Sequence, residues 1–159
     1  MRVRIAVLAA APLLLALAAC SPSADHSSDK ADSVASAKGQ QKVEVQVVKT
    51  DLGPVLADQT GRTLYAFVKD KANRSNCDAK CIAVWPALAG RMQASAGPGV
   101  DKGLISGISR TEKTVQTAYN KWPLYYYVGD AAAGDINGQG LDDEWFVVGA
   151  DGRLIAKTS

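Results

Sequence analysis

The sequence predicts a mainly β protein: a small antiparallel β domain of two pseudo-symmetric repeats with one short helix near residues 78–85. The first observation is internal repetition. A shift of 60 residues places segment 64–70 on segment 124–130, with Leu, Tyr, Val and Asp identical, and Trp85 on Trp145. The second is that the globular part consists of short runs rich in branched and aromatic residues, separated by glycine turns. We therefore expect two copies of a hairpin followed by a tryptophan, each covering the apolar face of the other.

The N-terminal segment predicts export and lipidation. An apolar run of 14 residues, Ile5 to Ala18, follows two arginines and is too short to span a bilayer, which is typical of a signal-peptide core. The run leads into Leu17-Ala18-Ala19-Cys20, which resembles the bacterial lipobox. In that class of signals the cysteine is acylated and becomes the mature N-terminus. We therefore expect residues 1–19 to be a signal peptide and Cys20 to carry palmitate or related chains, with an ordinary secretory signal as the alternative.

The segment 20–41 is predicted to be a disordered tether on a membrane. It is rich in Ser, Ala, Asp and Lys and has no aromatic residue, so it cannot bury enough apolar surface to offset its ordering entropy. Its single histidine, His26, is expected to face solvent rather than bind a metal. Acyl chains contribute about 0.8 kcal/mol per buried methylene, which anchors the chain firmly. Ser21 beside the lipidated cysteine favours the outer membrane, facing the periplasm, if the organism has two membranes.

The charge balance narrows the class of function. Of 18 Lys and Arg residues, Arg2 and Arg4 lie in the signal segment, which leaves 16 basic residues against 16 acidic ones. A near-neutral chain argues against a nucleic-acid partner, which requires a clustered basic surface. The globular part contains no histidine and no Gly-x-Ser-x-Gly segment. We therefore expect neither a hydrolase nor a bound cofactor.

The first repeat, about residues 43–90, is predicted to contain short strands at 42–47, 55–57 and 62–68 and the helix near 78–85. Residues 42–47 alternate polar and apolar side chains, the period of a half-buried strand. Leu52-Gly53-Pro54 is predicted as a turn, and Gly61 closes a hairpin turn between the next two strands. Pro86 is expected to stop the helix.

The second repeat, about residues 104–156, is predicted to contain strands at 105–109, 114–119, 122–127, 144–148 and 153–156. Asn120-Lys121 is a two-residue turn between two of these strands, and residues 134–140 form a glycine-rich loop. The β-rich domain as a whole is expected to occupy residues 42–159.

Each repeat carries the same spaced motif, Tyr-x-aromatic-x-x-Asp. Its members are Tyr65, Phe67 and Asp70 in the first copy and Tyr125, Tyr127 and Asp130 in the second. Together with the lipobox, this motif resembles the tandem secreted repeat of bacterial lipoproteins that carry a Yx(F/W/Y)xxD motif. The resemblance covers roughly residues 50–155 and implies no established activity. It also implies a connection with growth on hydrocarbons in some relatives, which would suit a surface protein that contacts apolar ligands.

The motif has a structural and a functional interpretation. In the structural one, each tyrosine packs in the core and each aspartate caps a turn by accepting backbone N–H groups. In the functional one, Tyr65, Tyr125, Asp70 and Asp130 line one cleft and supply an acid-base pair. No nucleophile accompanies them, so we favour the structural interpretation.

Two further groups of residues are candidates for chemistry. Cys77 and Cys81 are an even pair in an oxidising compartment, and their spacing suits a structural disulfide, with a redox or copper(I) site as the alternative. Asp135 opens a segment similar to a calcium loop, but Phe146 stands where the bidentate carboxylate is expected, so a solvated turn is favoured.

The last candidate is an aromatic surface. Trp122 and residues 125–127 are close enough together that a strand shows some of them on each face. Trp122 and Tyr126 are therefore a candidate binding surface for an unknown protein or small-molecule ligand, with burial against the other copy as the alternative. Taken together, the sequence predicts a membrane-anchored, non-catalytic binding or structural module, with a redox or copper-handling protein as the rival hypothesis.

Overall fold

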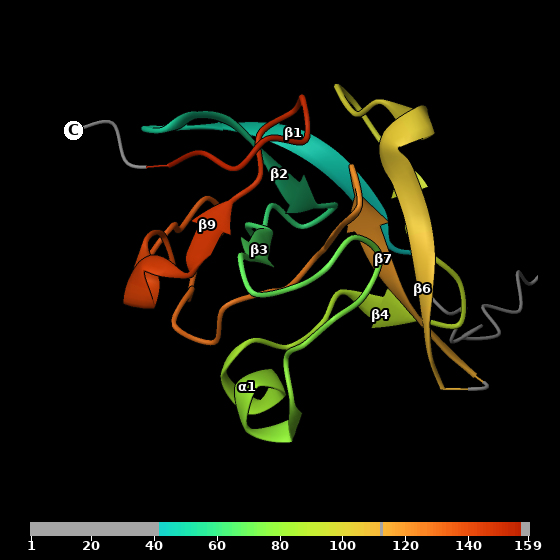
Figure 1. Cartoon of the computed structure of the whole chain (residues 1–159). Helices are drawn as coiled ribbons and strands as arrows, with labels where there is room; N and C mark the ends of the chain where they lie inside the picture. The colour runs from blue at the N-terminus through green and yellow to red at the C-terminus, as the bar shows by residue number, and fades with distance from the viewer. Residues whose placement is uncertain (1–41, 112, 157–159) are drawn as a thin grey trace, which may run out of the picture. The chain divides into compact units, whose positions relative to one another are not determined.

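The computed structural model describes residues 42–111 and 113–156 (Figure 1). The predicted signal peptide at 1–19, Cys20 and the tether at 20–41 with His26 lie outside the described residues. Within the described part of the chain, no helix is long and apolar enough to cross a membrane.

The described chain is a set of short strands with three helical turns. The strands are β1 (Glu44–Thr50), β2 (Gly53–Asp58), β3 (Tyr65–Phe67), β4 (Ala89–Gly90), β5 (Ser95–Ala96), β6 (Ile105–Thr111), β7 (Thr114–Tyr119), β8 (Trp122–Pro123) and β9 (Trp145–Val147). The helical turns are α1 (Ala79–Val84) and the 3₁₀ turns η1 (Lys102–Leu104) and η2 (Leu141–Asp143). The predicted mainly β fold of two repeats with one short helix is confirmed.

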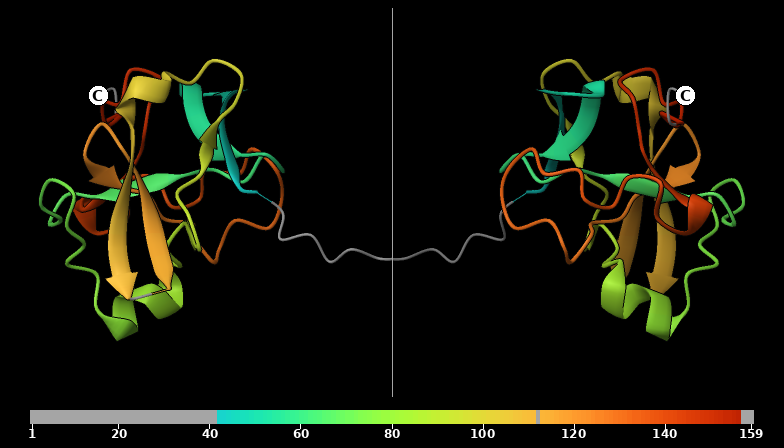
Figure 2. Two further views of the ribbon diagram at one scale, coloured as in Figure 1. Left: turned by 90° about the vertical axis from the view of Figure 1, so that its right-hand side faces the viewer. Right: turned by 90° about the vertical axis from the view of Figure 1, so that its left-hand side faces the viewer.

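Each repeat begins with an antiparallel hairpin, β1–β2 in the first and β6–β7 in the second. The β6–β7 hairpin forms a long ribbon at one side of the domain (Figure 2). β7 also pairs with β4 and β8, so the second hairpin is the centre of a four-stranded sheet. β1 receives β5 on its other edge as a parallel partner, which the sequence did not predict. This pairing covers an edge of β1 that would otherwise expose unpaired backbone groups.

The repeats meet at a central crossing. Tyr65 N–H donates to Tyr125 O at 2.9 Å, and Tyr125 N–H donates to Tyr65 O at 3.0 Å. Each tyrosine also pairs with the last part of the other copy: Tyr65 with Val147 in β9, and Tyr125 with Ala87. Because these pairings are reciprocal, a pseudo-twofold axis passes between the two tyrosines.

Several predicted strands are shorter than expected. The predicted strand 62–68 is β3 alone, and 122–127 contains only the two residues of β8. The physical reason is the crossing, because after each hairpin the chain leaves its own sheet to bond the other repeat through isolated bridges. The predicted turn at Leu52-Gly53-Pro54 is partly wrong, since Gly53 and Pro54 already pair with β1. The predicted closing strand 153–156 is reduced to one bridge, Val148 with Leu154.

The hairpin turns differ by one residue, which shifts the repeat register. In the first repeat Leu64 N–H donates to Leu56 O, whereas in the second Leu124 N–H donates to Thr117 O. The equivalent positions are therefore 60 apart after the turn and 61 apart before it. A uniform shift of 60 residues predicts that Val55 is equivalent to Val115, but these hydrogen bonds make Val55 equivalent to Gln116, so the uniform shift is wrong for this strand. Asn120 and Lys121 form the shorter turn with φ of 46° and 69°, the left-handed pair that a two-residue hairpin requires.

Two hydrophobic clusters support the domain, and all of their members lie between residues 43 and 155. The first contains Val45, Leu56, Leu64, Leu88 and Tyr119 among its buried side chains. The second is the aromatic one, with buried members Val55, Tyr65, Phe67, Cys77, Trp85, Tyr125, Trp145 and Val147. Because both clusters belong to the described chain, the domain carries its own core.

Candidate functional site

The motif tyrosines and aspartates form two hydrogen bonds between repeats. The Tyr65 hydroxyl donates to Asp130 Oδ2 at 2.8 Å, and the Tyr125 hydroxyl donates to Asp70 Oδ2 at 2.7 Å. The tyrosine of each repeat therefore bonds the aspartate of the other, and not its own. Both tyrosines and Asp70 are buried, whereas Asp130 is half-buried, so water is excluded more fully from the bond between Tyr125 and Asp70.

The second oxygen of each aspartate holds the loop that follows it. Asp70 Oδ1 accepts the N–H of Asn76 at 2.6 Å, and Asp130 Oδ1 accepts the N–H of Asn137 at 3.0 Å. The side-chain amide of Asn137 donates to Gly129 O, and that of Asn76 donates to Lys69 O, so both asparagines also bond the residue before the aspartate. The structural interpretation of the motif, a core tyrosine and a turn-capping aspartate, agrees with this geometry.

A third set of contacts differs between the repeats. Gly138 N–H donates to the Tyr65 hydroxyl at 3.2 Å. In the first repeat, the Cys77 N–H donates to Ser75 Oγ at 3.2 Å, and Ser75 Oγ shares a hydrogen bond of 2.7 Å with the Tyr125 hydroxyl. Cys77 and Gly138 are therefore equivalent positions, and the first repeat inserts a serine hydroxyl between backbone and tyrosine.

Burial sets the protonation of these groups. Desolvation, followed by the bond to Asp130, raises the pKa of Tyr65 far above its usual range, and desolvation is also the main cause that raises the pKa of Tyr125. Desolvation raises the pKa of Asp70 and of Asp130 as well, against the hydrogen bonds that each receives. A phenol that holds its proton so firmly is a poor general base near neutral pH. The geometry is that of two structural bonds rather than an acid-base pair.

The motif's third position and the repeated tryptophan form a stack across the axis. Phe67 stacks on Trp145 with centroids 4.4 Å apart, Trp145 stacks on Trp85 at 3.8 Å, and Trp85 lies 4.5 Å from Tyr127. Tyr65 contacts Trp85 edge-on at 5.3 Å, and Tyr125 contacts Trp145 in the same way at 5.3 Å. Offset and edge-to-face contacts of this kind add to the free energy gained from burial. Every position of the motif therefore contributes to joining the two repeats.

Cys77 and Cys81 are disulfide-bonded, with their Cα atoms 5.2 Å apart. The pair spans the start of α1, where the Asp78 carboxylate accepts the N–H groups of Lys80 and Cys81 as an N-cap. The predicted disulfide is thus present. Cys77 is buried in the aromatic cluster, whereas Cys81 is partly exposed.

The two residues predicted as a binding surface are both half-buried. Tyr126 donates its hydroxyl to Asp58 Oδ2 at 3.0 Å, and the Arg62 guanidinium lies 4.1 Å from its ring centroid. Desolvation raises the pKa of Tyr126, and the Asp58 charge adds to that effect. Trp122 packs against the first core cluster and lines a hollow of about 240 Å³ with Lys121 and Asp70. Neither motif tyrosine lines this hollow. The four motif residues therefore do not line one shared cleft, which the functional interpretation required.

The Asp135 loop is built as a turn. Asp135 Oδ2 accepts the N–H groups of Ala131 and Ala132 at 2.9 and 2.8 Å. Asp142 and Asp143 are exposed and have positive φ. Among the described residues, no cluster of three or more His, Cys, Asp or Glu side chains is arranged to hold a metal ion.

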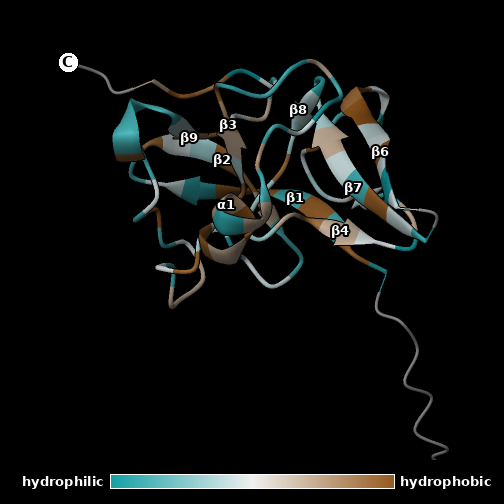
Figure 3. Ribbon diagram, turned by 60° about the horizontal axis from the view of Figure 1, so that its bottom comes forward, coloured by the Kyte–Doolittle hydropathy of each residue, from teal (hydrophilic) through white to brown (hydrophobic). Residues whose placement is uncertain are grey.

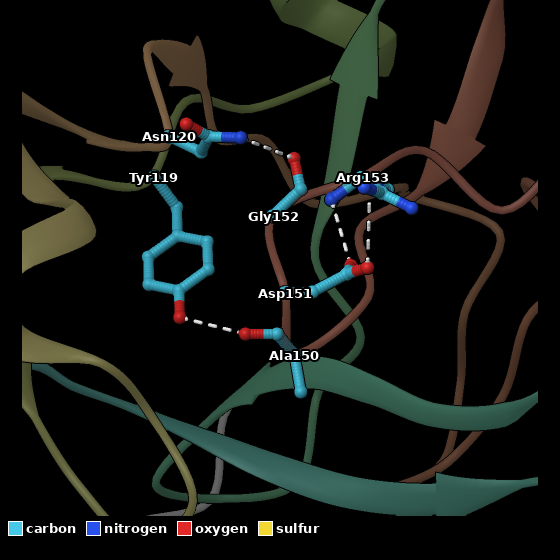
Figure 4. Close-up of polar contacts among 6 residues, drawn as sticks. All are labelled: Tyr119, Asn120, Ala150, Asp151, Gly152 and Arg153. Carbon is cyan, nitrogen blue, oxygen red and sulfur yellow. Dashed lines mark hydrogen bonds and ion pairs between the residues drawn. The ribbon is translucent and has the colours of Figure 1, made fainter.

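The end of the described chain is tied to the second hairpin (Figure 4). The Tyr119 hydroxyl donates to Ala150 O at 2.8 Å, and the Asn120 amide donates to Gly152 O at 3.1 Å. A Cβ at Gly152 would lie 2.4 Å from Asn120 Cβ, and its φ is 75°, so glycine is required at this turn. These bonds hold the turn at 150–153 against the core.

Sequence reasoning missed Ser75, Asn76, Asn137 and Gly138. The signal was present but offset, because Asn76 follows its aspartate by six residues and Asn137 follows by seven. The ungapped shift therefore matches Asn137 with Cys77 and hides the pair. An alignment with one gap in this loop would have revealed it.

The fold and the site define a tandem β repeat in which each copy supplies the hydrogen-bond acceptor and half of the aromatic stack for the other. The comparisons with known proteins agree. Residues 46–89 and 106–149 both match the model of a family described as a secreted repeat of unknown function, and together they exceed half of the chain, so the chain belongs to this family. The predicted resemblance is confirmed. The chain has no significant match among curated proteins and none among solved structures.

Proposed function

We propose that this chain is a lipoprotein of the cell envelope, anchored through Cys20, whose repeat domain is a non-catalytic binding or structural module. Membership of a secreted family is consistent with an extracellular or envelope location. The lipobox-like segment that ends at Cys20 supports the lipid anchor. The proposed partner is therefore a lipid membrane, together with a protein or small-molecule ligand.

One observation carries the non-catalytic part of the proposal: the polar atoms of the repeated motif bond one another. Tyr65 and Tyr125 are fully buried and donate to Asp130 and Asp70, respectively. The other oxygens of these aspartates accept backbone N–H groups. The polar groups of the motif therefore join the repeats and are not an exposed acid-base pair for a substrate.

The binding part of the proposal places contacts at Trp122 rather than at Tyr126. Trp122 lines the hollow of about 240 Å³, whereas Arg62 covers the ring of Tyr126 and Asp58 accepts its hydroxyl. Trp122→Ala is expected to weaken contact with a ligand, and Tyr126→Phe, which keeps the ring, serves as the comparison. Loss of binding only in Tyr126→Phe would contradict this placement.

The redox or copper alternative rests on the partial exposure of Cys81 in the disulfide with Cys77. A structural disulfide resists reduction by glutathione, whereas a redox-active one has a higher potential. Titration of free thiols in glutathione buffers separates the two: sulfurs that stay bonded support the structural module, and ready reduction supports the alternative. The connection with growth on hydrocarbons stays a prediction.

The anchor is tested by mass spectrometry of the mature N-terminal peptide and by membrane fractionation. We expect a peptide that begins at Cys20 with acyl chains attached, and we expect Cys20→Ser to leave the membrane fraction. The matched control is Cys77→Ala/Cys81→Ala, which removes the other two cysteines and should remain in the membrane fraction. A mature chain that begins elsewhere without acylation would sink the proposed anchor.

A further inference from the structure

A basic face lies where the described chain begins. Lys42, Arg91 and Lys102 line a hollow of about 790 Å³ together with Met92, and Arg91 also lines a neighbouring hollow with Lys113. We use "basic face" for these four cations and Met92. All five side chains are exposed, and Met92 is the most exposed large apolar residue described, at 70%.

The described linings of the two hollows carry positive charge only. None of the described residues that line the two hollows is Asp or Glu. The ion pairs of the described chain join Lys69 to Glu144 and Arg153 to Asp151, and neither includes a cation of the basic face. Three acidic residues stand within two positions of these cations in the sequence, Glu44, Asp101 and Glu112, and the Asp101 carboxylate accepts the Gly103 N–H at the start of η1. Four cations therefore gather around two hollows whose described linings include no acidic residue.

The basic face is also the part of the domain closest along the chain to the predicted anchor. Lys42 is the first described residue and the point where the predicted tether joins the domain. If the predicted tether behaves as a flexible chain of about 20 residues, its root-mean-square length is roughly 25 Å. Arg91 directly follows β4, Lys102 lies in η1 before β6, and Lys113 stands in the turn between β6 and β7. The strands β4, β7 and β6 lie side by side (Figure 3). A domain held at this distance meets the membrane surface repeatedly.

We propose that the basic face docks the domain onto anionic phospholipid headgroups of the membrane that carries the anchor. The inference rests on the lipid anchor proposed above and adds a defined orientation. Lys42, Arg91, Lys102 and Lys113 contact the headgroup phosphates, and Met92 enters the interface between them. The motif residues play no part in this contact.

The expected strength follows from the number of cations. Each Lys or Arg near an anionic leaflet strengthens binding about fivefold at moderate salt. Removal of two cations should therefore weaken partitioning about 25-fold. Salt should weaken it too, because the Debye length falls to about 3 Å at 1 M.

The test uses residues 21–159, which lack the acyl chains and keep the whole domain. Its failure is therefore distinct from failure of the anchor, which is read from the mature N-terminus. The probe is large vesicles of 30% phosphatidylglycerol in phosphatidylcholine, compared by co-sedimentation with vesicles of phosphatidylcholine alone. We expect binding to the anionic vesicles only, loss of binding at high salt, and about 25-fold weaker binding for Arg91→Gln/Lys102→Gln.

The matched control removes the same charge elsewhere. Lys49 and Lys71 are exposed and do not line the basic face, and Lys49 lies at the opposite end of β1 from Lys42, about 20 Å away along the strand. Lys49→Gln/Lys71→Gln should bind as tightly as the parent, with both variants shown to be folded by their near-ultraviolet circular dichroism. Three results would overturn the proposal: no binding to anionic vesicles, equal weakening by both double variants, or binding that persists at high salt.

Discussion

The two repeats form the same hydrogen bond between tyrosine and aspartate, but the loops that contact the two tyrosine hydroxyls differ. Tyr65 and Tyr125 both donate to the aspartate of the other copy. Behind Tyr125, the first repeat has Ser75 and a disulfide at Cys77. Behind Tyr65, the second repeat has the backbone N–H of Gly138 alone. One repeat fixes the loop with a covalent bond, and the other brings the backbone close to the rings.

The difference shows that the repeated motif specifies the contact between copies and not the loop that supports it. A Cβ at Gly138 would lie 2.7 Å from Trp85 Cη2 and 2.9 Å from Tyr65 Cε1, so the second repeat has no room for a side chain there. The first repeat places Cys77 at this position and uses its sulfur in the disulfide. Loop composition can therefore vary as long as each aspartate keeps its place.

The prediction with the largest expected effect removes either of the two tryptophans, Trp85 and Trp145, that stack where the repeats meet. Trp85→Ala and Trp145→Ala should each cost about 3–5 kcal/mol of unfolding free energy, because both indoles are buried and stack on each other. Urea unfolding measures the loss. Trp122→Ala, which removes a half-buried ring outside the stack, should cost less. If one of the two central variants lost almost nothing, the two repeats would not be equivalent at the axis.

The disulfide gives a smaller effect that is confined to the first repeat. Closing so short a loop contributes roughly 2 kcal/mol in the chain-entropy model, so Cys77→Ala/Cys81→Ala should lose about that amount. Unfolding of the parent protein with and without a reductant provides the comparison. An unchanged urea midpoint in both experiments would show that α1 and its Asp78 cap hold the loop without the covalent bond.

Gly138→Ala tests the same position in the second repeat. Overpacking against Trp85 and Tyr65 should cost about 1–3 kcal/mol, through displaced rings rather than a lost bond. The expected signature is a changed near-ultraviolet circular dichroism spectrum, since the tryptophan stack must move. A fully stable variant with an unchanged spectrum would contradict the close packing.

Alkaline pH should lower the free energy of unfolding of the domain, because buried tyrosines of both repeats contribute to it. Burial raises the pKa of Tyr65, Tyr125 and Tyr126, so these phenols stay protonated in the folded chain above the pH at which they ionise when unfolded. Their contribution is fully present below about pH 10 and is lost as the pH rises toward the folded values, at about 1.4 kcal/mol per pH unit for each tyrosine. Urea unfolding at pH 9 and pH 11 measures this loss. Tyr126→Phe removes one of the three phenols, so its free energy of unfolding should fall by about 1.4 kcal/mol less per pH unit than that of the parent. If more than two of the five tyrosines became tyrosinate near pH 10 without unfolding, the burial of these three would be contradicted.

The prediction with the smallest expected effect tests the hydrogen bond between the repeats most directly. A double-mutant cycle of Tyr65→Phe with Asp130→Asn should give a coupling of about 1 kcal/mol, because the two side chains share a hydrogen bond. The same cycle with Asp70→Asn, within one repeat, should give a coupling near zero. Equal couplings in the two cycles would mean that the bonds do not cross between repeats.

Much of this fold was predictable from spacing and periodicity. Residues 114–119 form β7 as predicted, and the helix predicted near 78–85 is α1. The repeat, the disulfide and the buried tyrosines also followed from the sequence, because identical residues at one offset and an even cysteine pair are local signals. The predicted binding role of Trp122 stays a prediction.

The pairing of strands and side chains between the two copies could not be predicted from the sequence. A strand pattern at 62–68 and 122–127 does not reveal that Tyr65 and Tyr125 pair with each other, since periodicity contains no information about the partner strand. The parallel pairing of β5 with β1 was hidden for the same reason. The aspartate of the partner copy could not be chosen over that of the same copy from spacing alone.

The hydrogen bond between Tyr65 and Asp130 also determines when a secreted chain with this fold can complete its folding during export. A chain threaded N-terminus first delivers its first repeat to the far side of the membrane before residue 130 has crossed. Until then Tyr65 has no acceptor, and Trp85 lacks the ring of Trp145 against which it stacks. The first repeat of an exported chain must therefore wait as an open chain, exposed to proteases, until nearly the whole polypeptide has been translocated. A chain truncated before the second repeat is expected to be degraded rather than to accumulate as half a domain.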